Sequence, residues 1–338
     1  MKFSLEKKNS IRTYILEKVA CKTESLSKYV SEELGISQNT VHNYITELQD
    51  ENIIAKTKRG CYELVTQRYE YNLKRSLGEL DNDTYVYESF VHPIVEKLES
   101  NVQYIWNYGI SEMTNNVIDH SMAENLKVVI EQNYIFTRVS LIDDGIGIFR
   151  KIKDHFSLSS LDEAICELFK GKLTTDAENH SGEGIFFTSK MMDEFFIYSD
   201  GKVFTADKYD NDSVSDKTDM KSGTYVSMTL SNSTNKEVAE IFDRYSDDDS
   251  AFTKTKVPLK NIFDKAPVSR SQAKRLCNRF EQFDEVEIDF EGIEWMGQGF
   301  AHQVFVVYAK SQPQIKLKPT NMCDAVKNMY NHVVAALR

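Results

Sequence analysis

The stretch Trp106–Ser121, WNYGISEMTNNVIDHS, decides how the centre of this 338-residue chain is interpreted. We predict that it is helical, so Glu112 and Asn116, which are four residues apart, share one face of the helix. A carboxylate and a carboxamide at this spacing are common in helices. The pair therefore gains its meaning from the motifs that follow it in the chain.

Three further motifs follow in a fixed order. Leu141–Gly147, LIDDGIG, is an apolar strand that runs into Asp-x-Gly-x-Gly. His180–Ile185, HSGEGI, places Gly182 and Gly184 at the start of a helix, and a later strand, Ser222–Leu230, begins Ser-Gly-Thr. An ordinary β-turn or helix entry would explain any one of these motifs. Four motifs in register favour a single binding module.

Taken in this order, the motifs resemble those of the GHKL ATPase family, which includes gyrase-type topoisomerases, heat-shock chaperones of the ninety class, histidine kinases and MutL-type repair proteins. The resemblance covers about residues 80–232, and ISEMTNNVIDHS is most similar to the anti-sigma-factor serine kinases. It implies a Bergerat α/β sandwich that binds ATP and Mg²⁺, with a lid at residues 148–181. Within the lid, Lys172 and His180 are weaker candidates for phosphate contact.

The resemblance implies a role for each residue of the motifs. Asn116 would ligate Mg²⁺, because a carboxamide oxygen is a hard ligand, and Glu112 would act as the catalytic base. Asp143, rather than Asp144, would accept a hydrogen bond from the adenine amino group. The other expected cofactor-binding residues bring backbone close to the nucleotide or support a bound water, and they are Gly145, Gly147, Gly182, Gly184 and Thr224.

Residues 1–67 show a pattern of three helices followed by a hairpin. The expected helices cover residues 10–20 with Ser10 as the N-cap, 24–34, and 38–51 with Ser37 as the N-cap, and the expected strands are NIIAKT and CYELVT. This order resembles the winged helix-turn-helix of bacterial transcription regulators. The resemblance implies that the third helix enters a DNA groove and that the hairpin acts as the wing.

The residue types in this segment suit DNA. Polar side chains on the outer face of the third helix can read base edges, and these are Gln38, Asn39, His42 and Asn43. Lys58 and Arg59 at the hairpin tip can meet phosphate. The net charge of residues 1–68 is only +2, whereas the rest of the chain carries −13. A protein-docking or dimerisation module is therefore the alternative interpretation.

The C-terminal part of the chain alternates strands and helices. After a helical connector at residues 68–100 and the ATPase region, we predict a polar linker at 233–256 and a small α/β domain at 257–338. Ile288–Ile293, IDFEGI, and the following MGQGF resemble a STAS-type domain, the fold of anti-sigma-factor antagonists. In antagonists a phosphoacceptor serine follows this strand, whereas residues 292–299, GIEWMGQG, contain no Ser or Thr. We therefore expect the domain to dock a protein partner or to sense a signal.

Composition limits the remaining possibilities. The chain has a net charge of −11 and no apolar run of about 20 residues, so no membrane-spanning helix is expected. Its five cysteines are far apart, which favours reduced thiols in a cytoplasm. The expected fold class is an α+β multidomain protein: a winged helix-turn-helix, a GHKL sandwich and a STAS-like domain.

Two functions are compatible with this organisation. The first is a DNA-binding transcription regulator, with slow Mg²⁺-dependent ATPase activity, whose nucleotide state controls dimerisation and the presentation of two winged heads. The alternative is a serine protein kinase of the anti-sigma-factor type that acts on a separate STAS partner. The lack of an acceptor serine at residues 292–299 favours the regulator.

Overall fold

The computed structural model of the chain describes residues 4–173, 182–205, 220, 222–263 and 266–335. Its contacts form two compact units. The first unit comprises residues 1–70, 129–138 and 231–233, and the second comprises residues 71–128, 139–230 and 234–338. Helices, antiparallel pairs and a parallel sheet occur together, so the predicted α+β multidomain class is confirmed. Among the described helices, none combines the length and hydropathy needed to cross a membrane.

Three helices and an antiparallel hairpin begin the first unit, namely α1 (Leu5–Ala20), α2 (Leu26–Leu34), α3 (Gln38–Asp50), β1 (Ile54–Lys58) and β2 (Cys61–Leu64). Apolar residues at helical spacing form one hydrophobic core, in which Ile15, Val30 and Ile45 are buried. Ser37 caps α3, because its hydroxyl accepts a hydrogen bond from the Thr40 N–H.

The start of α1 differs from the prediction. The helix begins at Leu5, and its cap is Ser4, whose hydroxyl accepts a hydrogen bond from the Lys7 N–H. Ser10 lies inside the helix and donates to the Glu6 carbonyl, so its prediction as a cap was wrong. The apolar stripe begins only at Ile11, whereas the preceding turn consists of polar helix-forming residues that carry no periodic signal.

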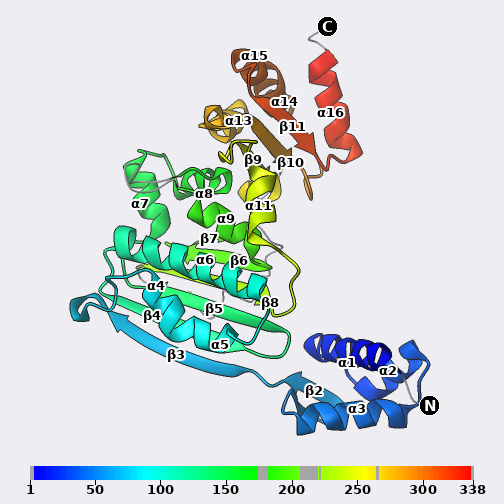
Figure 1. The fold of residues 1–338 in the computed structure, drawn as a ribbon. Coiled ribbons are helices and arrows are strands. Elements are labelled where there is room, and N and C mark those ends of the chain that lie inside the picture. The colour runs from blue at the N-terminus through cyan, green and yellow to red at the C-terminus, as the bar shows by residue number, and fades with distance from the viewer. Residues whose placement is uncertain (1–3, 174–181, 206–219, 221, 264–265, 336–338) are drawn as a thin grey trace. The chain divides into compact units, whose positions relative to one another are not determined.

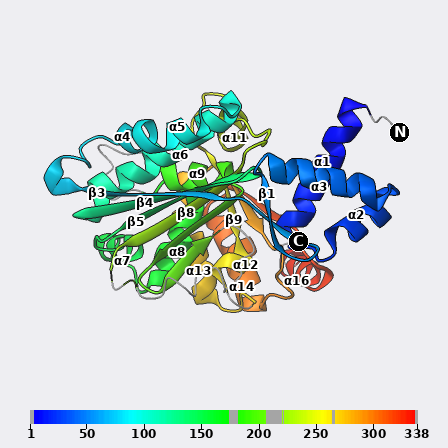
Figure 2. The ribbon, with the colours of Figure 1, turned by 90° about the horizontal axis from the view of Figure 1, so that it is seen from below.

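A six-stranded sheet has the order β3-β4-β5-β8-β6-β7, of which β3, β4, β5 and β8 are labelled in Figure 2. Its strands are β3 (Gln67–Lys74), β4 (Asn125–Gln132), β5 (Phe136–Asp143), β6 (Glu194–Ser199), β7 (Lys202–Thr205) and β8 (Thr224–Ser231). Strand β6 pairs antiparallel with both β7 and β8. Strand β8 is buried along nearly its whole length, which places it at the centre of the packing.

The structure corrects the helical prediction for the start of residues 68–100, because Gln67–Lys74 form strand β3. In this strand the partly buried or buried Tyr69, Tyr71 and Leu73 alternate with exposed polar residues. Such a period of two is the signature of a half-buried strand. Short helical pieces follow it, namely η1 (Arg75–Leu77), α4 (Thr84–Val86), η2 (Tyr87–Val91) and α5 (His92–Val95).

Helices α6, α8 and α9 lie on one face of the six-stranded sheet (Figure 1). The longer helices of this region are α6 (Ser100–Asn116), continued by the π-helical turn η3 (Val117–Ser121), α7 (Ile148–His155), α8 (Leu161–Lys170) and α9 (Gly184–Met191). Trp106 of α6 and Phe187 of α9 are fully buried. The motif helix predicted at 106–121 is therefore helical, and its apolar side packs into the core.

A three-stranded parallel sheet of order β11-β10-β9 forms the centre of the C-terminal module, which we define as residues 254–335. Its elements are β9 (Lys254–Pro258), α12 (Leu259–Ile262), α13 (Arg270–Cys277), η4 (Phe280–Gln282), β10 (Glu285–Asp289), α14 (Gln298–His302), η5 (Gln303–Tyr308), α15 (Ala309–Ser311), β11 (Lys316–Thr320) and α16 (Asp324–Ala335). The predicted alternation of strands and helices is confirmed.

The predicted linker at residues 233–256 is not an exposed link. It contains helix α11 (Val238–Tyr245), in which Ile241 and Tyr245 are buried, and the first residues of β9. The Phe242 ring packs on the Phe187 ring of α9, with the two centroids 4.2 Å apart. The polar residues that suggested a linker cover one face of an amphipathic helix, and the apolar residues on its other face pack against α6 and α9.

Candidate functional site

A cavity of about 340 Å³ lies in the second unit. Its walls come from the helices α6, α7, α8 and α9, from the turn after β5, and from the strands β6 and β8. Seven of the predicted site residues line it, and they are Glu112, Asn116, Asp143, Gly147, Gly182, Gly184 and Thr224. The fold thus brings together motifs that are far apart in the sequence. The volume falls within the range of about 300–1,000 Å³ typical of ligand pockets.

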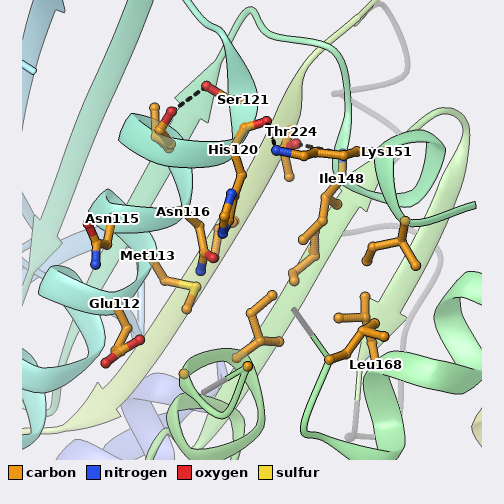
Figure 3. Close-up of a pocket in the computed structure, with 18 of the residues that line it drawn as sticks. Glu112, Met113, Asn115, Asn116, His120, Ser121, Ile148, Lys151, Leu168 and Thr224 are labelled. Carbon is orange, nitrogen blue, oxygen red and sulfur yellow. Dashed lines mark hydrogen bonds between the residues drawn. The ribbon is translucent and has the colours of Figure 1, made fainter. Parts of the chain in front are cut away.

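Helix α6 provides the first wall. Glu112 and Asn116 project from this helix toward the cavity, and Ile148, Lys151 and Leu168 lie across from them (Figure 3). The Glu112 carboxylate also lies against the backbone of Gly184, the first residue of α9. A Cβ atom at position 184 would overlap Glu112 Oε2, so this close approach requires glycine.

Asp143 is the most buried charged group of the cavity. It ends β5, only 5% of it is exposed, and burial raises the pKa of its carboxyl to about 6. Hydrogen bonds from Gly145, whose N–H lies 2.8 Å from Oδ1, and from Thr224 act to lower that pKa. The Asp143 carboxyl faces the cavity, and no cationic side chain is among the groups that shift its pKa.

The neighbouring Asp144 is placed differently. It is exposed, and it accepts hydrogen bonds from the backbone N–H groups of Glu124 and Asn125, at 3.0 and 2.9 Å, and from the Asn125 side chain. Partial burial acts to raise its pKa, but these hydrogen bonds lower it overall. Asp144 therefore holds the turn in shape, while Asp143 faces the cavity, which agrees with the choice of Asp143 from the motif.

Thr224 and Gly145 hold the elements around the cavity in place. Thr224 Oγ1 accepts a hydrogen bond from the Ile148 N–H at 3.2 Å, so β8 holds the start of α7. Gly145 does not line the cavity. It packs against the Ser121 carbonyl, which a Cβ atom would overlap. Its place in the motif follows from this close packing and from its hydrogen bond to Asp143.

Sequence reasoning did not predict a role for Lys151. This α7 residue lines the cavity, and its Nζ donates to the His120 carbonyl at 2.9 Å (Figure 3). It places a cation in the wall of the cavity. The spacing from Gly147 was the only available signal, since one lysine in a charged amphipathic helix is unremarkable.

The lid candidates have different outcomes. Lys172 does not line the cavity: its Nζ donates to the Gln282 carbonyl at 2.9 Å and lies over the Phe252 and Phe283 rings. Its prediction as a phosphate contact therefore lacks support. His180 and the lid residues 174–181 lie outside the described residues.

The predicted DNA-contacting residues all lie in the first unit. Those on α3 share its exposed face, and they are Gln38, Asn39, His42 and Asn43. Lys58 and Arg59 are exposed at the hairpin tip. Lys58 Nζ pairs with Glu24 at 2.7 Å, and both side chains are more than two-thirds exposed. Because such a solvated pair is weak, phosphate can replace the carboxylate.

No group of three or more His, Cys, Asp or Glu residues in the described part of the chain is arranged to hold a metal ion. Asn116, the metal ligand expected from the motifs, lines the cavity. Mg²⁺ in nucleotide sites is usually held by one or two protein ligands, water and the substrate's phosphates. The cavity is therefore compatible with Mg²⁺ that arrives with a nucleotide.

Comparison with known families identifies one part of the chain. Residues 272–327 match a family described as a STAS-like domain of unknown function (DUF4325). The match lies within the C-terminal module, so this module contains a STAS-like domain. No curated protein sequence matches the chain.

The raised pKa of Asp143 predicts a distinct pH dependence of stability. In the unfolded chain this carboxyl has a pKa near 3.9. Below that pH the protonated carboxyl stabilises the folded state, and this stabilisation is lost as the pH rises through about 6. The free energy of unfolding of the wild type, relative to Asp143→Asn, should thus fall by about 3 kcal/mol over this window and then level off. Urea unfolding at a series of pH values measures it.

The matched control is Asp144→Asn. Because hydrogen bonds lower the pKa of Asp144, the wild type should show no such fall relative to this variant above about pH 5. Equal pH dependence for the two comparisons would contradict the assignment of Asp143 as the buried carboxyl.

Proposed function

We propose that the protein is an ATP-binding, DNA-binding transcription regulator whose nucleotide state controls the pairing of two copies and the presentation of their N-terminal heads. The observation that carries the proposal is the cavity, which gathers seven of the eight nucleotide-site residues expected from the motifs. The three-helix and hairpin order of residues 5–64 supports a winged helix-turn-helix. The sheet covered by α6 and α9 supports a GHKL fold for residues 80–232.

Asp143 is the residue best suited to select adenine. Asp143 is a buried carboxylate that faces the cavity, so it can accept a hydrogen bond from a ligand. The exocyclic amino group of adenine is such a donor. Guanine presents a carbonyl oxygen at the equivalent position, which would face the carboxylate unfavourably. Thr224 and the turn that contains Gly147 border the same part of the cavity.

Glu112, Asn116 and Lys151 would act at the phosphate end. The Glu112 carboxylate beside Gly184 can accept a proton from a water molecule, and the N–H groups at the start of α9 can stabilise negative charge. Asn116 would hold Mg²⁺, which neutralises phosphate charge when bound. Lys151 adds a cation on the opposite wall.

We expect Asp143→Asn to weaken ATP binding by about 10- to 100-fold, because a charged hydrogen bond of roughly 1.5–3 kcal/mol is lost. Titration calorimetry with ATP and GTP measures the effect and the selectivity. Asp144→Asn is the control and should change the affinity much less, since Asp144 binds the backbone of residues 124–125. Equal wild-type affinity for ATP and GTP would rule out adenine selection by Asp143.

Glu112→Ala and Asn116→Ala should separate hydrolysis from binding. Loss of a positioned general base typically lowers a rate by about 10²–10⁴-fold, so Glu112→Ala should still bind ATP but lose turnover. Asn116→Ala should instead lose the Mg²⁺-dependent part of ATP binding. Phosphate-release assays combined with calorimetry distinguish these results. Wild-type turnover in both variants would mean that the motif has been assigned wrongly.

The α3 face and the hairpin tip would contact DNA in different ways. The exposed amides on α3 are suited to base edges, whereas Lys58 and Arg59 are suited to phosphate. The low net charge of residues 1–68 implies few phosphate contacts per head. A dimer that reads two half-sites about one helical turn apart would compensate for this.

Substitutions in the two groups should therefore have different effects. Asn39→Ala and Asn43→Ala should relax sequence preference, at about 1–3 kcal/mol for each base contact. Lys58→Ala and Arg59→Ala should weaken binding to all sequences and reduce the salt slope by about 1. Selection from genomic fragments, followed by anisotropy titrations at several salt concentrations, tests both. Lys28→Ala, an exposed lysine on α2, is the control.

Tight binding of a single head to one short site would contradict the dimer. Absence of DNA binding in every nucleotide state would favour a docking module.

A further inference from the structure

The wall of the cavity between α8 and α9 is attached to the C-terminal module. In the segment Leu168–Leu173, the residues Leu168, Gly171 and Leu173 line the cavity. Two of the residues between them, Lys170 and Lys172, contact the C-terminal module instead. This one short segment therefore faces the candidate nucleotide site on one side and the STAS-like domain on the other.

Lys170 anchors the segment. Its side chain is completely buried, and Nζ donates to Glu167 Oε1 at 2.7 Å, to the Asn278 carbonyl at 2.6 Å and to the Arg275 carbonyl at 3.2 Å. All three ammonium protons thus have acceptors, two of them in the C-terminal module. A buried charge with these partners resists separation of the two surfaces, because separation would leave it unpaired.

Glu167 completes the charge balance. It is 3% exposed and accepts hydrogen bonds from Asn278 Nδ2 at 3.1 Å and from Arg279 Nη1 at 3.3 Å. The salt bridge inside α8 is thereby extended to the module by one amide and one guanidinium. Neither charge depends on solvent, so the contact is a specific interface rather than a loose surface pair.

The module also holds the backbone on both sides of Gly171. Thr255 Oγ1 donates to the Lys170 carbonyl at 2.7 Å, and Arg279 Nη2 donates to the Lys172 carbonyl. Gly171 itself has a positive φ of 80°, and a Cβ atom there would meet the Phe252 ring at 2.8 Å. Lys172 and Arg279 also have positive φ values, of 51° and 62°. Non-glycine residues in this region persist only where their surroundings hold them.

An aromatic contact runs parallel to these polar ones. Phe186 of α9 lines the cavity, its ring lies 4.7 Å from that of Phe252, and Phe252 lies 5.4 Å from Phe283 in the C-terminal module. The Leu173 N–H also donates to the Gly182 carbonyl at 3.0 Å, which connects the segment to the next cavity residue. Displacement of the segment would thus change several lining residues together.

We propose that Thr255 and Arg279 of the C-terminal module are positioning residues of the nucleotide site, which act by holding the Gly171–Leu173 wall in its binding shape. The inference rests on the proposed nucleotide-binding function, and it makes the STAS-like module a structural part of that site. Anything that moves the module against α8 would alter nucleotide affinity through these two side chains.

Two conservative substitutions test the proposal in the full-length protein. Thr255→Val keeps the side-chain shape and removes the hydroxyl, and Arg279→Lys keeps the charge and removes the guanidinium fork. Each should raise the Kd for ATP by about 2- to 10-fold, the value of one or two hydrogen bonds. Thr320→Val and Arg270→Lys are the matched controls, because Thr320 bonds to Glu287 and Arg270 is exposed at the start of α13. Both controls should bind ATP like the wild type.

Hydrogen exchange without nucleotide provides a second readout. The Gly171 and Leu173 amides should exchange faster in Thr255→Val and Arg279→Lys than in either control, while exchange in β10 is unchanged. Unchanged exchange, or faster exchange with wild-type ATP affinity, would overturn the proposal. If the wild type itself bound no adenine nucleotide, the proposed function would fail. The exchange result would then show separately whether the module holds this wall.

Discussion

Burial of the Asp143 carboxyl is the constraint on which the candidate site depends. A carboxylate that is almost fully covered is unfavourable unless donors surround it, and here the donors are Gly145 and Thr224. These partners bring the turn after β5 against the start of β8, and Thr224 in turn holds the start of α7. The shape of the cavity and its chemistry therefore have one cause, since the group that organises these elements also faces the ligand space.

The role that we propose for the C-terminal module at the cavity wall goes beyond its family match, which is to a domain of unknown function. Residues 272–327 match a STAS-like domain, yet Asn278 and Arg279 from this region bind α8 through a fully buried lysine–glutamate pair. A buried ion pair stabilises little on balance, but it is sensitive to misalignment. Such a pair therefore suits a contact whose function depends on the alignment of the two surfaces. The lack of Ser and Thr in residues 292–299 is compatible with the proposed role of the module at the cavity wall.

The first unit has a different physical character. The core between α1, α2, α3 and β1 consists of apolar side chains, and the residues expected to contact DNA lie on the exposed α3 face and at the hairpin tip. Arg12 of α1 forms salt bridges with Glu47 and Glu51 near the end of α3, which neutralise part of the negative charge there. The exposed amides of α3 are consequently not masked by strong local charge. Affinity for a polyanion would depend on a few cations and on pairing of heads.

The sequence alone determined the helix at 106–121, the strand ending at Asp143, the turn glycines and the alternation of strands and helices at the C-terminus. Each of these features depends on local periodicity or on local turn chemistry. Tertiary structure decided what local pattern could not. The alternation in residues 67–74 is a local strand signal, but their place at the sheet edge beside β4 is set by tertiary pairing, and α11 packs through the contact of Phe242 with Phe187. Lys151 lines the cavity, whereas Lys172 donates a hydrogen bond to the Gln282 carbonyl. Lys151 lies in α7 and Lys172 lies two residues after the end of α8, and only the long-range partners of each lysine determine where its charge lies.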